Sequence, residues 1–247
     1  MHDNERKIGR REVLALLGVT SAVFAAGCAS ESPTSPSTMG SAADVATGTT
    51  TTGGTGTTTG TSGLACSVTP NETVGPYPSL VDLFRSDIRE SRGGTQLDLI
   101  ITVINTAASC APLTGVNVEI WQCDAGGNYS QYGSERAQTY LRGIQTSDAN
   151  GQVKFTTVYP GWYQGRATHI HVEVTQNGRS LKVTQIAFPE STNAEVYGTG
   201  VYAARGSNPT TNARDGIFAD SLSSEMATVL GSPSSGYTAN FTVGLAA

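Results

Sequence analysis

The feature of this chain that most restricts its fold is the alternation of apolar and polar residues along six short segments. Successive side chains of a β-strand point to opposite faces of the sheet, so a period of two marks strands with one buried face. In the first segment, Leu97, Leu99, Ile101 and Val103 fall on one face. We therefore expect a fold made mainly of strands. The six segments span residues 97–105, 116–121, 152–158, 169–175, 181–188 and 237–243.

Turn signals between these segments define the fold class further. Residues 110–115 read CAPLTG, residues 148–151 read DANG and residues 176–179 read QNGR, and such runs are typical of turns. Only residues 220–230 show a helical pattern, and it is weak. Short strands at this spacing predict an all-β fold, either an antiparallel β-sandwich or an open barrel, with few short helices.

The first 27 residues have the composition of an export signal. Arg10 and Arg11 precede an apolar stretch from Val13 to Ala26, about fourteen residues long, whereas a membrane-spanning helix needs about twenty. A basic start, a short apolar segment and a small-residue end are typical of a secretory signal, and the arginine pair resembles a twin-arginine signal. We expect residues 1–27 to direct export.

Cys28 ends a stretch that resembles a bacterial lipobox, in which the cysteine becomes the lipidated N-terminus. Ala25 stands where leucine is usual, so a plain secretory signal is the alternative. Residues 28–63 are almost wholly Ser, Thr, Gly, Ala and Pro, which bury too little surface to offset the entropy of ordering. We expect a flexible tether and a protein anchored to the cell envelope by lipid, or a secreted one if Cys28 is not lipidated.

Residues 64–247 are numerous enough for one domain with a substantial core. The whole chain has 15 Lys and Arg against 20 Asp and Glu. Residues 1–27 hold four of these basic and three of these acidic residues, which leaves 11 against 17 in the remainder. The resulting charge of about −6 argues against a nucleic-acid partner, which would require a basic patch.

Three cysteines fall in this domain, Cys66, Cys110 and Cys123. Outside the cytoplasm we expect one disulfide and one remaining thiol. Cys110 lies in a predicted turn and Cys123 ends the following strand, so these two are too far apart to pair. Cys66 is therefore expected to pair with one of them, and the sequence does not choose between the two.

His169 and His171 are the only histidines beyond His2, and they stand two positions apart in a predicted strand. Their side chains point to one face, and the apolar residues around them point to the other. The rise of a strand places their Cα atoms about 6–7 Å apart, which suits two nitrogens that converge on one metal ion. Two surface histidines on an exposed strand face would give the same pattern, so the pair alone leaves both possibilities open.

Three longer motifs accompany the histidines. Residues 69–78 read TPNETVGPYP, residues 118–130 read VEIWQCDAGGNYS, and the run 140–174 ends in PGWYQGRATHIHVEV. In order and spacing these motifs resemble those of the intradiol ring-cleavage dioxygenases, which are non-haem iron enzymes that open catechols between the two hydroxyls. The resemblance covers most of residues 66–243 and favours an exported, single-domain branch of that family.

The resemblance implies an antiparallel β-sandwich that holds one ferric ion per chain between two tyrosinates and two histidines. Motif by motif, it identifies these ligands as Tyr129, Tyr163, His169 and His171. It further implies that Gly75, Pro76, Tyr77, Arg166 and Gln185 bind the substrate, and that Tyr163, Arg166 and Gln185 take part in catalysis. Tyr159 competes with Tyr163 on spacing alone, and only the register of the family motif favours Tyr163.

The chemistry of these residue types agrees with that assignment. Phenolate oxygens are hard, charged donors that favour Fe(III), whereas two histidines alone would suit zinc or copper equally well. Free tyrosine has a pKa near 10, so the charge of the ion must remove both phenol protons. The implied reaction adds both atoms of O2 to a catechol and gives a muconate-type dicarboxylic acid.

Two alternatives share part of the pattern. One is a non-catalytic, exported, transthyretin-like β-sandwich that serves as a binding module. The other is a zinc or copper site made from the histidines alone. Neither requires Tyr129 and Tyr163 at those positions, so the four residues together disfavour both. The sequence does not indicate which catechol is cleaved or how many chains assemble.

Overall fold

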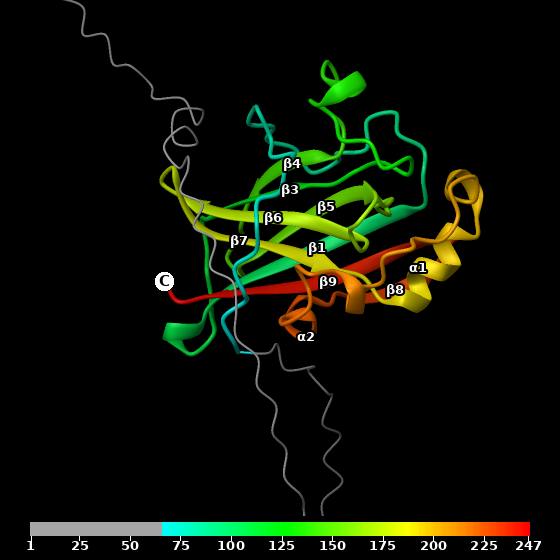
Figure 1. Ribbon diagram of the computed structural model, residues 1–247. Coiled ribbons are helices and arrows are strands. Elements are labelled where there is room, and N and C mark those ends of the chain that lie inside the picture. Colours follow the sequence, from blue (N-terminus) through cyan, green and yellow to red (C-terminus); the bar gives the residue numbers. More distant parts are fainter. Residues whose placement is uncertain (1–65) are drawn as a thin grey trace, which may run out of the picture. The chain divides into compact units, whose positions relative to one another are not determined.

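The computed structural model describes residues 66–247, so the predicted export signal at 1–27, Cys28 and the rest of the predicted tether at 28–63 lie outside the described residues. Two β-sheets form the central part of the described domain (Figure 1). The five-stranded sheet contains β1 (Gln96–Asn105), β2 (Ala111–Pro112), β5 (Gln152–Val158), β8 (Thr228–Ser232) and β9 (Gly236–Leu245). The four-stranded sheet contains β3 (Asn117–Trp121), β4 (Arg142–Thr146), β6 (His169–Gln176) and β7 (Arg179–Ala187).

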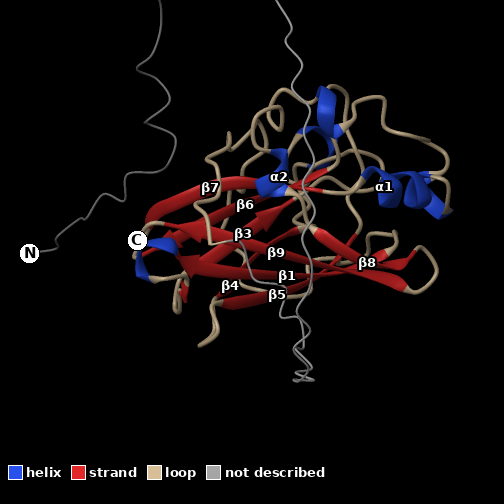
Figure 2. Ribbon diagram, turned by 90° about the horizontal axis from the view of Figure 1, so that it is seen from below, coloured by secondary structure: helices blue, strands red, loops and turns tan. Residues whose placement is uncertain are grey.

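The helices of the described domain are short. Figure 2 shows α1, α2 and long loops gathered on one side of the strands. Within residues 66–247, no helix is both long and apolar enough to cross a lipid bilayer. The helical segments are α1 (Glu190–Tyr197), α2 (Leu222–Glu225) and the 3-10 turns η2 (Thr106–Ala108), η3 (Gly133–Glu135), η4 (Gly200–Tyr202) and η5 (Asn212–Arg214).

The strand order confirms the sandwich and adds one parallel pair. The four-stranded sheet runs in the order β4-β3-β6-β7, and all its neighbours are antiparallel. The other sheet runs β2-β1-β9-β8, with β5 also paired to β1. Its β1 and β9 are parallel, whereas the sequence predicted antiparallel strands. Parallel neighbours need a long connection, and here that connection is the rest of the domain.

The alternation read from the sequence describes the core correctly. Leu97, Leu99, Ile101 and Val103 of β1 are all completely buried. They belong to one cluster with the inward residues of β3 and β6, so the core lies between the two sheets. Burying a side chain of this size stabilises a fold by about 1.5–3 kcal/mol, so this cluster is the main source of stability.

The helix predicted at residues 220–230 is wrong over most of its length. Only Leu222–Glu225 is helical, and β8 begins at Thr228. The longer helix α1, at Glu190–Tyr197, is absent from the sequence prediction. Its buried positions include Thr192 and Asn193, so it has no apolar stripe with a helical period.

A disulfide and hydrogen bonds to both sheets hold the segment before β1. A disulfide joins Cys66 to Cys110, with their Cα atoms 5.7 Å apart, and Cys123 is a buried free thiol. The Thr69 amide donates to the Gly244 carbonyl at 2.8 Å, and the Lys182 ammonium donates to the Thr69 carbonyl at 2.6 Å. In Figure 1 this cyan segment crosses β6 and β7. The disulfide settles the choice that the sequence left open.

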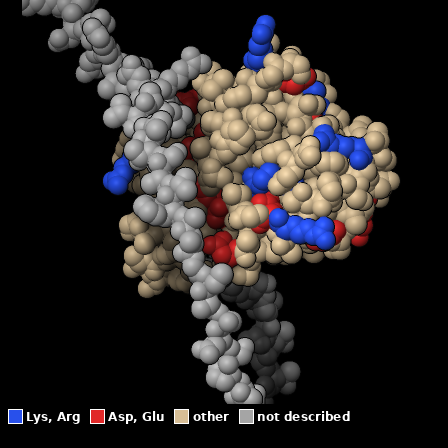
Figure 3. Space-filling model, viewed as in Figure 1, with Lys and Arg blue, Asp and Glu red and all other residues tan. Residues whose placement is uncertain are grey.

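Charged side chains are unevenly distributed on the face shown in Figure 3. Acidic side chains gather in a band near the middle of this face, and Lys and Arg side chains stand farther apart from one another. The whole chain carries a formal net charge of −5.

Candidate active site

The candidate site lies at one end of the four-stranded sheet, where β3 and β7 end and β6 begins. Trp121 of β3 pairs with His171 of β6, and His171 pairs with Gln185 of β7. Residues paired across strands point to the same face, so these three side chains share one face of the sheet. Ile170 and Val172 point to the opposite face, into the core. The site therefore occupies the outer face of the sheet, under the loops.

His169 and His171 are buried, with 3% and 0% of their surface exposed, so the alternative of two exposed surface histidines is wrong. Their Nε2 atoms are 3.2 Å apart. His169 Nδ1 lies 2.7 Å from the carbonyl oxygen of Ala167 and donates its hydrogen there, which leaves a lone pair on Nε2. The two rings thus bring one nitrogen each to the same point.

Both imidazoles stay neutral at pH 7. Burial, followed by the charge of Arg166, lowers the pKa of His169 to about 3. Burial lowers the pKa of His171 well below its ordinary value, and the neighbouring His169 lowers it further. A neutral imidazole is the form that binds metal ions, so the site is ready to accept one without losing protons from these rings.

Two neighbours fix the ring of His171. The indole of Trp121 stacks on it, with ring centroids 4.8 Å apart and planes 3° apart. The backbone of Gly75 also contacts it, because a Cβ atom at Gly75 would lie 2.9 Å from His171 Cε1. Gly75 has φ of +70°, a conformation that side chains rarely adopt. Residue 75 must therefore be glycine for two independent reasons.

Tyr163 and Tyr129 lie beside the histidines. The hydroxyl of Tyr163 is 3.5 Å from His169 Nε2. The ring of Tyr129 is 5.7 Å from that of Tyr163 and 6.4 Å from that of His171, between centroids. Tyr159 lies elsewhere, in the core, where its hydroxyl is 2.7 Å from Asn193 Oδ1. Of the two tyrosines that compete on spacing, Tyr163 is the one next to the histidine pair.

The hydroxyl of Tyr129 is one of three polar atoms of the site that are buried without a hydrogen-bond partner among the described residues, with Trp121 Nε1 and His171 Nδ1. Tyr129 is 4% exposed, and its hydroxyl is buried without a hydrogen-bond partner among the described residues. Burial raises the pKa of Tyr129 well above its ordinary value, and it also raises the pKa of Tyr163, although Arg166 opposes the second shift. A buried hydroxyl without a partner costs about 1–3 kcal/mol, which a bound cation would offset.

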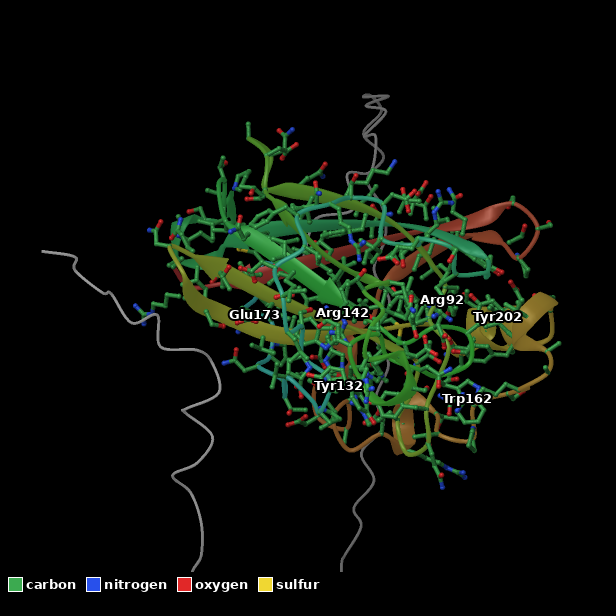
Figure 4. The ribbon with its side chains drawn as sticks, turned by 90° about the horizontal axis from the view of Figure 1, so that it is seen from above. Arg92, Tyr132, Arg142, Trp162, Glu173 and Tyr202 are labelled. Atoms are coloured by element: carbon green, nitrogen blue, oxygen red, sulfur yellow. A yellow bond between two sulfur atoms is a disulfide. The ribbon has the colours of Figure 1, made fainter. Side chains whose placement is uncertain are left out.

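Tyr77 and Arg142 connect the predicted substrate segment to the loop of Tyr129. The ring of Tyr77 stacks on that of Tyr129, with centroids 4.6 Å apart. Arg142, which is buried, donates to the Tyr77 carbonyl at 2.9 Å and to the Ser130 carbonyl at 2.7 Å. Its guanidinium also lies 5.5 Å from the ring centroid of Tyr132 (Figure 4). Arg142 thus joins two site segments that are distant in sequence.

Arg166 and Gln185, which the sequence predicts to bind the substrate, are in contact with each other. Arg166 Nη2 donates to Gln185 Oε1 at 2.6 Å, and Gln185 Nε2 donates to the Thr73 carbonyl at 2.9 Å. Arg166 Nη1 lies 3.4 Å from the hydroxyl of Tyr163. The structure adds Asp215, whose carboxylate accepts a hydrogen bond from Arg166 Nε at 2.9 Å.

These donors fit a ferric ion better than an ion held by histidine alone. Within residues 66–247, no three side chains of His, Cys, Asp and Glu come together as a metal-binding group. The histidine pair supplies two neutral nitrogens, and the phenol rings next to it are those of Tyr129 and Tyr163. Two phenolates would supply the hard, negative donors that Fe(III) prefers.

Comparisons with known proteins identify the family of this chain. A family model described as "Dioxygenase" matches residues 81–207, about half of the chain. The solved structure of an intradiol ring-cleavage dioxygenase from Tetranychus urticae is 31% identical, with a TM-score of 0.65 over 73% of this chain and 94% of that one. The chain belongs to the intradiol ring-cleavage dioxygenases.

Two curated relatives of this dioxygenase chain are catechol 1,2-dioxygenases. The protein from Candida albicans is 32% identical over 108 residues, which cover 35% of this chain and 36% of the relative. The protein from Acinetobacter baylyi is 30% identical over 146 residues, or 49% of this chain and 46% of the relative. The chain therefore spans less than half the length of the curated relatives it matches.

Family membership confirms the resemblance and the β-sandwich inferred from the sequence. In this member of the intradiol dioxygenases, the structure brings Tyr129, Tyr163, His169 and His171 together, and Arg166 and Gln185 border them. Of the predicted substrate segment, Gly75 contacts His171 and Tyr77 contacts Tyr129, whereas Pro76 is exposed. Asp215 escaped the sequence reasoning because no motif surrounds it and 46 positions separate it from His169.

Proposed function

We propose that the domain is a non-haem Fe(III) dioxygenase that cleaves a catechol between its two hydroxyl-bearing carbons with O2, giving a muconate-type dicarboxylic acid. One observation carries the proposal. Two neutral histidine nitrogens lie 3.2 Å apart beside two tyrosines, one of which has a buried hydroxyl without a partner. In this proposal Tyr129, Tyr163, His169 and His171 hold one ferric ion per chain.

Each residue has a role that follows from its position. Ferric iron bound there would act as a Lewis acid toward the two catechol oxygens. As a phenolate, Tyr163 would take up a catechol proton and become a neutral phenol, since Tyr163 is only half-buried and lies at the Arg166 side of the site. Arg166 would place fixed positive charge where negative charge develops during the attack of O2.

The remaining side chains would shape the substrate space. Gln185 would hold Arg166 and the Thr73 carbonyl in place, through hydrogen bonds of 2.6 and 2.9 Å. Gly75, Pro76 and Tyr77 would line the space for the aromatic ring, with Tyr77 packed on Tyr129. The buried Trp121 would exclude water from the back of His171.

The decisive experiment measures metal content, colour and product together. Protein purified with iron available should contain about one iron per chain and show visible absorption from tyrosinate-to-iron charge transfer. A panel of catechols supplied with O2 should give ring-opened dicarboxylic acids, and the best substrate would define the substrate class. Colourless protein that holds zinc, and that stays inactive after iron is restored, would favour a zinc site or a binding module instead.

We also propose that the protein is exported and anchored by lipid at Cys28, with residues 28–63 as a tether and residues 64–247 as the catalytic domain. The support is the sequence of residues 1–63 alone. Cys28→Ser should release the protein from membranes or block its processing, because serine lacks the thiol that carries the lipid. The loss of the acyl chains should be decisive, since stable anchoring takes two or more of them. Replacing Arg10 and Arg11 with lysine should leave folded precursor in the cytoplasm. Soluble protein that begins beyond residue 28 would contradict the anchor.

A further inference from the structure

Two of the three guanidinium nitrogens of Arg166, Nε and Nη2, make short hydrogen bonds. Its Nε lies 3.1 and 2.9 Å from the two carboxylate oxygens of Asp215, and its Nη2 donates to Gln185 at 2.6 Å. Only Nη1, which lies 3.4 Å from the hydroxyl of Tyr163, has no short hydrogen bond. The free end of the guanidinium therefore points at the candidate metal site.

Asp215 is itself held rigidly. It is 1% exposed, and its oxygens also accept hydrogen bonds from the backbone amides of Ala167 at 2.7 Å and Ile217 at 2.9 Å. The amide of Ala167 belongs to the segment that leads into β6, so the same carboxylate fixes the side chain of Arg166 and the backbone beside it. A charged acceptor with several donors in place is a strong and directional contact.

The loop that carries Asp215 also contacts the turn of Tyr163 at other points. Asn208 Nδ2 donates to the carbonyl of Arg166 at 3.0 Å. The indole of Trp162 donates to the carbonyl of Gly206 at 3.0 Å, and the guanidinium of Arg205 stacks on the same indole at 4.2 Å. Of these hydrogen bonds, only that of Asp215 reaches the guanidinium of Arg166, and the ring centroid of Phe218 from the same loop lies 5.9 Å from the guanidinium carbon.

We propose that Asp215 is a positioning residue for Arg166, in addition to Gln185. This inference rests on the proposed function, because it assigns Arg166 a role toward the bound catechol. A free arginine side chain would lose conformational entropy each time it met the substrate, and Asp215 removes that loss in advance. Toward the substrate Asp215 acts through Arg166, and Asp215→Asn keeps an oxygen that can accept from the Ala167 amide, so the variant is expected to change turnover and to leave metal binding intact.

A double-mutant cycle tests the proposal. In iron-loaded protein, Asp215→Asn should lower kcat by about 10- to 100-fold, the size expected when a charged group is misplaced by about an ångström. In the Arg166→Gln background the same change should alter kcat less than about twofold, because the group that Asp215 positions is gone. Equal losses in both backgrounds would overturn the proposal, since they would show that Asp215 acts independently of Arg166.

A second measurement uses metal-free protein, so it does not depend on the proposed function. The Nε–H of Arg166 should give a nuclear magnetic resonance signal that exchanges slowly with water, assigned by its loss in Arg166→Gln. Asp215→Asn should make that exchange fast, and Asp148→Asn, which removes a carboxylate acceptor of two backbone amides in a distant turn, should not. Fast exchange in the wild-type protein would refute the contact, even if Asp215→Asn failed to fold.

The two measurements separate the possible failures. If the iron-loaded wild-type protein cleaves no catechol but the Arg166 signal is protected through Asp215, the proposed function fails and the contact stands. If cleavage occurs and the Arg166 signal is protected, but the cycle shows additive losses, the enzyme assignment stands and the positioning role fails.

Discussion

Replacing Gly75 with alanine offers a sharp test of how the site is built. Gly75 has φ of +70°, and Gly115, far from the site, has φ of +76° with no atom within 4 Å of the Cβ position. Alanine in a left-handed conformation costs about 1–2 kcal/mol, and the less flexible unfolded chain returns about 0.4–1 kcal/mol. The backbone conformation should therefore cost each variant about 1 kcal/mol of stability, or about 0.5 M in the urea midpoint of a small domain, and the contact with His171 should add to that loss in Gly75→Ala.

The two variants should differ in their affinity for iron. A Cβ atom at Gly75 would lie 2.9 Å from His171 Cε1, whereas carbon atoms in contact normally stay about 3.5–4.0 Å apart. The ring of His171 would have to move by about 0.6 Å or more, against the stacked indole of Trp121. Displacing a ligand by that much should weaken iron binding by about 10- to 100-fold, the range known for lost support of a metal ligand.

The assay is a chelator competition followed by visible absorption, together with urea unfolding of the metal-free proteins. Gly115→Ala should bind iron as the wild type does, and it should lose less stability than Gly75→Ala, whose added methyl group also presses on His171. The reasoning is refuted if both variants bind iron equally well, because the contact between Gly75 and His171 would then play no part in holding the ligand.

Three further predictions follow from the same structure. Removing the disulfide with Cys66→Ser and Cys110→Ser should lower the free energy of unfolding by about 3–4 kcal/mol, since the bond closes a long loop with a sequence separation of 44 residues, and an unchanged urea midpoint would contradict this. With iron bound, Tyr163→Phe should keep absorption from the Tyr129 phenolate and lose mainly turnover, Tyr129→Phe should weaken iron binding, and the core variant Tyr159→Phe should leave the spectrum unchanged. Folding lowers the pKa of His169 from 6.5 to about 3, so the unfolded chain binds more protons than the folded one between these pH values. The free energy of unfolding of the metal-free domain should therefore be full above pH 6.5 and fall as the pH drops toward about 3. Urea unfolding of the double variant His169→Gln, His171→Gln should show a smaller fall over that interval.

Most strands were predictable because their inward positions are uninterrupted apolar residues. β4 (Arg142–Thr146) was missed because its first buried residue is an arginine and its second a glycine. A buried Arg142 is stable only where carbonyl acceptors from Tyr77 and Ser130 converge on it, and those acceptors come from distant segments. Such a strand cannot be recognised from a local pattern.

The residues of the candidate site also fall into those that the sequence could indicate and those that it could not. His169, His171 and Tyr163 stand in one continuous motif, so a single stretch of sequence indicated them. Asp215 and the stacking of Trp121 on His171 depend on contacts between separate segments. The sequence contains no local signal for either contact, because each is a product of the sheet register and of the loop that returns over it.

The parallel pair of β1 and β9 has a consequence for how the chain is made. β1 emerges early and β9 comes last among the described strands, yet the two are hydrogen-bonded from Leu97 with Tyr237 to Asn105 with Leu245. Until residues 236–245 have been synthesised, one edge of β1 has no partner. Pairings between such distant segments fold slowly because a long loop must close first. The domain is thus bound to complete its folding after translation of β9, and a ribosome-bound intermediate would expose an apolar strand to chaperones.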